Sequence, residues 1–281
     1  MKHINKVSMA IDYIESNLTK RIDLDMVANA VHYSKYHLHR MFTKTLGMTL
    51  HDYQRRRQLT EAAKLLVFSD KSILDIALLS GYKSQQAFHS SFKSMYKLSP
   101  NKYRENERFY PLQLKYEFEG SFQMLDKKSD SQWEIAYATE EDIPCWMDLV
   151  RLVIDGFPHL HEDEHIGVLK QRIKTDQALI LKDGTIAVGI MLFSHITGSI
   201  DFMGTHPLYR QMGIPKAFLH KVMNELLDDK EISITTYRSG DKADTGHRRQ
   251  IIELGFAEAE LLVEFGYPTQ RFVLPREDIN E

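Results

Sequence analysis

The sequence predicts two domains: a helical domain built from two copies of a helix-turn-helix unit, then an α/β or α+β domain with a mixed sheet. Residue pairs recur at one separation in the first third of the chain, and helical periodicity dominates there. After residue 133, short strand-like runs alternate with helical ones. We place the helical domain at residues 1–105, an extended segment and linker at 106–132, and the second domain at 133–281.

The internal repeat has a period of 50 residues, since 92 − 42 and 84 − 34 both equal 50. Two copies of one unit therefore precede any other domain. The pairs at this separation are Ser34 and Ser84, Leu38 and Phe88, Phe42 and Phe92, and Tyr53 and Tyr103.

Apolar spacing predicts helices at 4–18, 22–31, 34–44 and 50–68. Ser72 and Asp75 form a capping-box pattern that opens a further helix, which ends near Gly81, a residue type that tolerates a left-handed turn. In the helix after that turn, helical spacing predicts an inward and an outward face. The inward set is Ala87, Phe88, Ser91, Phe92 and Met95, and the outward set is Gln85, Gln86, His89, Ser90 and Lys93.

Charge divides the chain. Residues 1–105 hold 17 Lys and Arg against 9 Asp and Glu, a net charge of +8, while the remainder holds 19 against 30, a net charge of −11. The first part should be attracted to a polyanion, and the acidic remainder should not bind nucleic acid itself.

Composition sets further limits. The chain of 281 residues is 43% hydrophobic, enough for two ordinary cores. It has no run of about 18 apolar residues and no apolar signal-peptide core near its amino terminus, so we expect a cytoplasmic protein without a membrane partner. The single cysteine, Cys145, excludes an internal disulfide.

The runs YSKYHLHRMFTKTLG, GYKSQQAFHSSFK and LSPNKYR make residues 1–105 resemble the AraC/XylS family of bacterial transcription regulators. The resemblance implies binding to a double-stranded DNA operator, with RNA polymerase as a further candidate partner. Arg can pair bidentately with guanine and Gln with adenine, which suits such a role. Carried over to this sequence, the base-contacting residues are Tyr36, His39, Arg40, Gln85, Gln86, Ala87 and Ser90.

Three successive arginines, Arg55, Arg56 and Arg57, stand at the start of the predicted helix 50–68. Such a run is commonly a solvated face. In this basic part of the chain we favour phosphate contact, and Arg55 and Arg56 join the predicted DNA-binding residues. We call the predicted helix 34–44 and the helix after Gly81 the reading helices, because their side chains would contact bases. A rigid helix between them would set them about 34 Å, or one turn of DNA, apart.

The second domain contains one stretch of particular interest, from Ser199 to Val222, which includes GTHPLYRQMGIPK. A strand there leads through a tight loop into a helix, a geometry whose free backbone N–H groups suit a pyrophosphate. The stretch resembles the acetyl-CoA-binding segment of the GNAT acetyltransferase superfamily, V-x-P-x-[YF]-R-x-x-G-x-[GA]. The resemblance implies acetyl-CoA as cofactor, contacted by Thr205, Arg210, Gln211, Met212, Gly213, Ile214 and Pro215.

Two departures from that family bear on catalysis. Pro215 stands where the family has glycine or alanine, and proline lacks a backbone N–H. Ile251 stands where the family has its general-acid tyrosine. Asp201 as base and Tyr237 as acid are the remaining catalytic candidates, with Tyr209 and Tyr267 as further candidate acids, although buried tyrosines commonly serve packing alone.

Two polar stretches of the second domain remain. Residues 159–165 contain metal-ligand types, but a polar loop needs no metal and we predict none. Residues 241–249 line the mouth of the ligand site or form a solvated loop, and both alternatives stay open.

The predicted function is sequence-specific DNA binding by a transcription regulator whose second domain binds acetyl-CoA or another small effector. Two alternatives remain: an active N-acetyltransferase that acts on an amine, and a regulator whose GNAT-like domain no longer binds CoA.

Overall fold

The computed structural model describes residues 2–118, 134–154, 162–227, 231–264 and 266–275. They divide into two compact units, with residues 2–118 in the first and residues 134–153 and 162–275 in the second. In the described part of the chain, no helix is both long enough and apolar enough to cross a bilayer. The first unit extends beyond residue 105, where the predicted helical domain ends.

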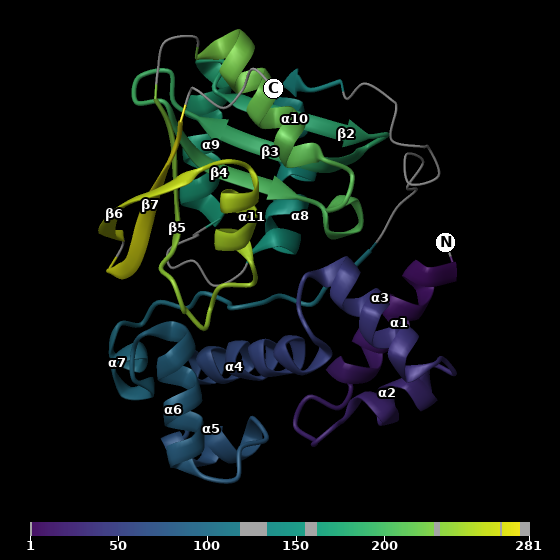
Figure 1. Cartoon of the computed structure of the whole chain (residues 1–281). Helices are drawn as coiled ribbons and strands as arrows, with labels where there is room; N and C mark the ends of the chain where they lie inside the picture. Colours follow the sequence, from purple (N-terminus) through teal and green to yellow (C-terminus); the bar gives the residue numbers. More distant parts are fainter. Residues whose placement is uncertain (1, 119–133, 155–161, 228–230, 265, 276–281) are drawn as a thin grey trace. The chain divides into compact units, whose positions relative to one another are not determined.

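The first unit is helical throughout. In Figure 1, α4 lies between the group α1 to α3 and the group α5 to α7. The predicted helix 50–68 is confirmed at both ends. The helices are α1 (Lys2–Glu15), α2 (Leu24–Ala30), α3 (Lys35–Leu46), α4 (Leu50–Phe68), α5 (Ile73–Leu79), α6 (Gln85–Tyr96) and α7 (Pro100–Glu105).

Polar side chains cap the helices of both copies. The hydroxyl of Ser72 accepts from the backbone N–H of Asp75 at 3.0 Å, which confirms the predicted start of α5. The caps Thr49 of α4 and Ser99 of α7 stand 50 residues apart and accept from residues Asp52 and Lys102 in the same way. The repeat therefore extends from sequence to capping geometry.

The turns inside the two copies differ by one residue. Gly81, with φ of +84°, follows α5, and its counterpart His32, with φ of +49°, follows α2. These two positions are 81 − 32 = 49 residues apart, whereas the helices that follow are 50 apart. The second copy thus holds one additional turn residue, Lys83, between Tyr82 and the cap Ser84.

The segment after α7 packs on the first unit up to residue 118. The hydroxyls of Tyr96 and Tyr103 donate to the carbonyl of Tyr110 at 3.3 and 3.1 Å. The backbone N–H groups of Leu112 and Gln113 donate to the hydroxyl of Thr60 on α4 at 3.1 and 3.2 Å. This stretch was predicted to be extended, and it belongs to the first unit. The predicted linker at 126–132 lies outside the described residues.

The second unit contains one mixed sheet, as predicted, in the order β1-β2-β3-β4-β5-β7-β6. Neighbouring strands are antiparallel except for β4 and β5. The strands are β1 (Ala136–Tyr137), β2 (Ala178–Asp183), β3 (Ile186–Phe193), β4 (Ser199–Thr205), β5 (Ile232–Tyr237), β6 (Ala257–Glu264) and β7 (Tyr267–Leu274).

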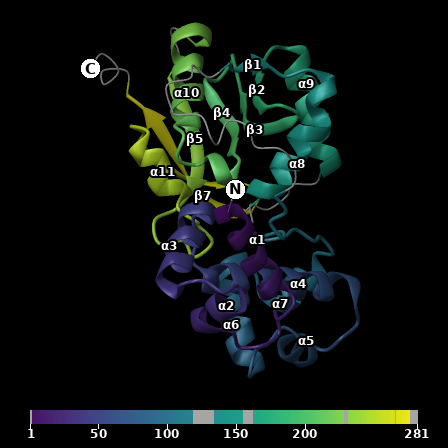
Figure 2. The same cartoon turned by 90° about the vertical axis from the view of Figure 1, so that its right-hand side faces the viewer.

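Helices cover both faces of this sheet (Figure 2). Helices α8 (Ile143–Val153) and α9 (Glu162–Lys174) form one apolar core with β2 and β3. Helices α10 (Ile214–Lys221) and α11 (His247–Glu253) form the other. A Cβ atom at Gly189 would lie 2.6 Å from Phe218 and 2.7 Å from Ile214, so this glycine permits α10 to pack closely on β3.

Helix α10 changes its hydrogen-bonding pattern near its carboxyl end. Regular α-helix stops at Lys221, and Val222–Leu226 form a π-helical turn. Helix α9 has thirteen residues and α11 has seven.

One cap position provides a stability test. Lys97 ends α6 with φ of +61°, and its counterpart Gly47 ends α3 with φ of +76°. A left-handed conformation costs a residue with a Cβ atom about 1–2 kcal/mol. Lys97→Gly should therefore raise the free energy of unfolding of the helical unit by about 1 kcal/mol in urea denaturation.

The matched control is Gly47→Ala, which should lower the same free energy by about 1 kcal/mol. A lower urea midpoint for Lys97→Gly would contradict this account and would assign more weight to the bond from Lys97 Nζ to the Ser94 carbonyl, which is 2.8 Å long.

Candidate nucleic-acid interface and ligand-binding loop

The first reading helix, α3, has one buried and one exposed face. Leu38 and Phe42 are fully buried. Tyr36 is 79% exposed, and His39 and Arg40 are also exposed. The predicted base-contacting side chains of the first copy therefore project from a helix that is anchored on its opposite face.

The second reading helix, α6, repeats this division. Phe88 and Phe92 are fully buried, while Gln85, Gln86 and Ser90 are exposed. Ala87, which apolar spacing placed on the inward face, is exposed as well, in keeping with its predicted base contact.

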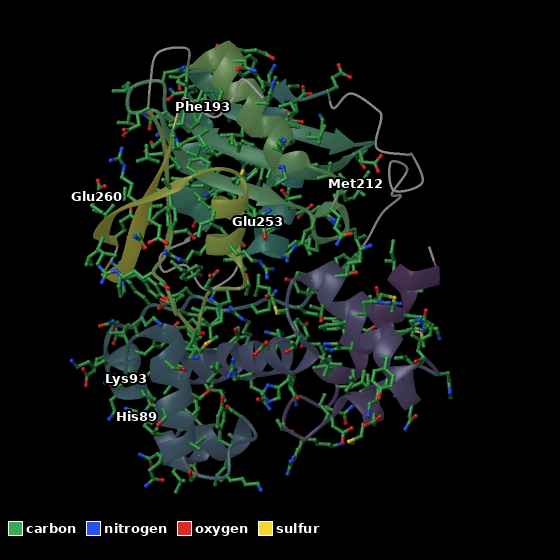
Figure 3. The ribbon with its side chains drawn as sticks, in the orientation of Figure 1. His89, Lys93, Phe193, Met212, Glu253 and Glu260 are labelled. Carbon is green, nitrogen blue, oxygen red and sulfur yellow. The ribbon has the colours of Figure 1, made fainter. Side chains whose placement is uncertain are left out.

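The exposed face of α6 also carries basic side chains. Figure 3 shows His89 and Lys93 on the side of α6 turned away from α4. They stand four residues apart, so they lie on one helix face. They extend the polar surface beyond the residues predicted to contact bases, and their outward orientation was already visible in the helical spacing.

The arginine run of α4 is the main correction to the predicted interface. Arg56 is 2% exposed and its Nη1 lies 3.5 Å from the carbonyl of Leu112, so a phosphate contact by Arg56 is incompatible with its burial. Arg57 is 7% exposed and donates to both carboxylate oxygens of Glu15 at 2.9 and 3.0 Å. Arg55 is half-buried and forms an ion pair with Asp52 at 2.9 Å. Arg56 and Arg57 thus hold α4 to other parts of the helical unit. The partner of Arg55 lies on α4 itself, so a phosphate contact by Arg55 stays a prediction.

In the second unit, the predicted ligand loop runs from the end of β4 to α10. A 3-10 turn at Pro207–Tyr209 is followed by Gly213, whose φ of +71° requires a left-handed residue directly before the helix. A Cβ atom at Gly213 would meet no atom within 4 Å. Glycine is thus needed here for backbone conformation and not for space.

Two buried side chains fix this loop to the sheet. The hydroxyl of Tyr209 donates to the buried carboxylate of Asp183 at the end of β2. His206 is 1% exposed, and its Nδ1 accepts from the backbone N–H of Leu208 at 3.2 Å. Burial, together with the nearby cation Arg210, lowers the pKa of His206 to about 4. The loop is therefore anchored by a phenol and a neutral imidazole.

Pro215 lies in the first turn of α10, where the helix needs no backbone N–H from it, and it is buried. Lys216 and Gln211 are exposed, whereas Ile214 is buried in the core beneath the loop. Of the predicted cofactor-contacting residues, Thr205 ends β4 and 210–215 are consecutive on the loop and helix start, where Ile214 and Pro215 are buried.

Strands β4 and β5 diverge directly beside this loop. They pair only at Ser199 with Ser233 and at Ile200 with Ile234. Beyond Ile200, no described residue of β4 pairs with β5, whose other edge pairs with β7 along its full length. One edge of β4 is thereby released from the sheet on the approach to the loop.

The candidate catalytic residues are engaged in other contacts. Asp201 accepts from Arg172 at 2.5 Å and from the hydroxyl of Ser199 at 2.6 Å. Tyr237 is 2% exposed and packs edge-on against Tyr267. The hydroxyl of Tyr267 donates to Asp241 at 3.0 Å.

The two remaining positions of the predicted chemistry give a similar result. Ile251, which stands at the general-acid position of the resembled family, is buried in the core beneath α11. His165 accepts from Trp146 Nε1 at 3.1 Å, and within the described ranges no three metal-ligating side chains gather at one point.

Comparisons with known proteins agree with the geometry of the first unit. The helix-turn-helix domain family matches residues 27–106. The HTH-type transcriptional activator AarP of Providencia stuartii is 42% identical over 104 residues, which cover 37% of this chain and 77% of AarP. The transcriptional regulator YbfP of Bacillus subtilis is 40% identical over 104 residues, but the match spans only 35% of YbfP.

Two solved structures are similar to parts of the chain. An AraC-type regulator from Chromobacterium violaceum covers 37% of this chain and 92% of its own, with 28% identity and a TM-score of 0.36. A GNAT family acetyltransferase from Bacillus cereus covers 51% of this chain and 96% of its own, with 15% identity and a TM-score of 0.40.

Two capped helix-turn-helix copies with polar reading helices define a DNA-binding protein of the tandem helix-turn-helix class. The chain belongs to the AraC-type family of DNA-binding transcription regulators. The family match ends at residue 106, within the first unit.

Base recognition by the reading helices can be tested directly. Arg40→Ala and Gln86→Ala should each weaken operator binding by about 1–3 kcal/mol and relax specificity at one position, because each removes a side chain able to pair bidentately with a base. Binding titrations against single-base operator variants measure this. The control is Lys64→Ala, an exposed cation on α4. Unchanged discrimination among operator variants in the Arg40 or Gln86 mutant would remove that residue from the interface.

The buried imidazole of His206 predicts a pH dependence. Its pKa of about 4 in the folded state lies below the value near 6.5 of an unfolded histidine, so the unfolded chain binds the proton first. Stability of the second unit should fall by on the order of 3 kcal/mol as the pH drops from 6.5 to 4. Urea unfolding across this pH range measures the slope.

His206→Asn keeps a hydrogen-bond acceptor for Leu208 but cannot be protonated in this range. It should flatten the pH slope relative to the native chain, in which buried His165, whose pKa is also lowered by burial, contributes in the same direction. Equal slopes for the variant and the native chain would refute the assignment to His206.

Proposed function

We propose that the chain is a sequence-specific transcription regulator that reads a two-part operator with α3 and α6 and responds to acetyl-CoA bound between β4 and α10. The observation that carries the first part is the pair of reading helices with exposed polar faces, held on one continuous helix, α4. The net charge of +8 on residues 1–105 supplies attraction to phosphates.

Two features of the second unit support an acetyl-CoA site. The start of α10 offers backbone N–H groups beside the cations Arg210 and Lys216, which suits a pyrophosphate. The edge of β4 released from β5 offers backbone groups that can pair with the amides of an extended chain such as pantetheine. Both features lie on consecutive segments, which fits one elongated ligand that carries phosphates at one end and amides along its length.

The same site favours binding without acyl transfer. Asp201 is occupied by Arg172 and Ser199, and the phenol of Tyr209 donates to Asp183. Ile251 replaces the tyrosine that would protonate a departing thiolate. We therefore propose a sensor of acetyl-CoA that acts on DNA binding.

Calorimetric titration of acetyl-CoA into the full-length chain, with and without operator DNA, tests this proposal. We expect micromolar binding and a several-fold change in acetyl-CoA affinity when DNA is bound, because linkage between two sites is reciprocal. Binding that DNA does not alter would contradict regulation, and absence of binding up to millimolar acetyl-CoA would contradict the ligand. Acetyl transfer to any of a panel of amines would contradict the sensor proposal and show that the second unit is an acetyltransferase.

Two glycines make a matched pair for this titration. Gly213 in the loop and Gly266 before β7 have φ of +71° and +76°, and a Cβ atom at either would meet nothing within 4 Å. Gly213→Ala should weaken acetyl-CoA binding about tenfold by distorting the helix start, at a backbone cost of roughly 1 kcal/mol that Gly266→Ala shares. Equal acetyl-CoA affinities for the two variants would contradict binding at this loop.

A further inference from the structure

Two segments of the first unit, one from each helix-turn-helix copy, meet at one place on α4. The loop between α1 and α2 belongs to the first copy, and the turn between α5 and α6 belongs to the second. Two glutamine side chains of α4 lie between them. We call this contact between the two DNA-reading copies the interhead junction. It consists of the backbone at 18–20 with Gln54, Gln58 and Gly81.

The glutamines bind the first copy through its backbone. Gln54 is 5% exposed, and its Nε2 donates to the carbonyls of Lys20 at 2.9 Å and of Leu18 at 3.4 Å. The Nε2 of Gln58 donates to the carbonyl of Leu18 at 2.6 Å. Gln54 is buried and Gln58 is half-buried, so breaking these bonds would leave polar atoms unpaired in a largely water-excluded contact.

Gly81 brings the second copy against the same loop. A Cβ atom at this position would lie 2.9 Å from the carbonyl oxygen of Thr19 and 3.0 Å from Nε2 of Gln58. Any side chain would therefore push the turn of the second copy away from the loop of the first.

The equivalent turn of the first copy shows that this glycine serves the contact. His32 occupies the corresponding position with φ of +49° and is exposed. Both turns close with the same backbone bond, from Tyr33 to Ala28 and from Tyr82 to Ala77. The turn thus tolerates a side chain, so the close approach between the copies accounts for glycine at 81.

We propose that the interhead junction sets the separation of α3 and α6 and thereby the spacing of the two operator half-sites that the chain accepts. Its residues are positioning residues, since they act on DNA through the placement of the reading helices. A change of one base pair shifts a half-site by about 3.4 Å and rotates it by about one tenth of a turn. A junction held by buried bonds resists that displacement.

The inference rests on the proposed reading of two half-sites by one chain. The test begins with an operator selected by the full-length chain from a random duplex library, with its half-sites mapped by single-base substitution. Variants of this duplex then carry one base pair more or fewer between the half-sites. The native chain should lose about 30-fold in affinity on either variant, the scale of one or two base mismatches.

Gln54→Ala with Gln58→Ala should reduce this spacing penalty to about threefold, while the loss of affinity for single-base mismatches inside each half-site stays as in the native chain. Gly81→Ala should shift the preferred spacing, because it separates the two copies. The matched control is Arg104→Gln, which breaks bonds from α7 to the carbonyls of Leu66 and Lys71 inside the second copy. This control should keep the native spacing penalty.

The outcomes separate the two claims. A native chain indifferent to spacing would refute the reading of two half-sites. A native chain that discriminates, together with junction variants that discriminate equally, would refute the role of the junction alone. If the double glutamine variant does not fold, Gln58→Ala and Gly81→Ala decide the question by the same measurement.

Discussion

The first unit depends on the buried polar side chains of α4. The ion pair between Arg57 and Glu15 joins α4 to α1 with two nitrogen–oxygen contacts, and the hydroxyl of Tyr53 donates to the same carboxylate at 2.8 Å. Removal of one partner would leave a buried charge without compensation. Thr60 and Arg57 hold the backbone at residues 112 and 113 from the same helix. A single helix thus connects the first copy, the second copy and the segment that follows them.

This arrangement explains how a small helical unit can present two reading helices at a defined distance. The apolar faces of α3 and α6 include the fully buried aromatic residues Phe42 and Phe92, which anchor each helix in the core. The buried polar contacts of α4 then fix the two copies relative to one another. Apolar packing is tolerant of small shifts, whereas directional hydrogen bonds to backbone carbonyls are not.

Much of the first unit could be predicted because its signals are local. The bounds of α4, the cap at Ser72 and the left-handed Gly81 follow from neighbours within a few residues. The burial of Arg56 could not be predicted, because arginine serves phosphates and buried carbonyls equally well and its partner Leu112 is 56 residues away. The one-residue difference between the turns has no signal in the residue pairs at a separation of 50, because all of these pairs follow the turns.

The second unit shows the same division between local and distant signals. The geometry of the predicted ligand loop could be inferred from Tyr209, Arg210 and Gly213, since the turn and the helix start are set by adjacent residues. The pairing of Asp201 with Arg172 joins residues 29 apart, and the divergence of β4 from β5 depends on strand pairing. Neither has a local sequence signal, yet both decide what chemistry the site can support.

The central claim is that one chain reads both half-sites through reading helices fixed on α4. The stoichiometry of the complex with the selected operator, measured by analytical ultracentrifugation together with hydroxyl-radical footprinting, tests it most directly. The account predicts one chain per duplex with protection in two successive major-groove segments about one turn apart. Two chains per duplex, each protecting a single segment, would contradict it.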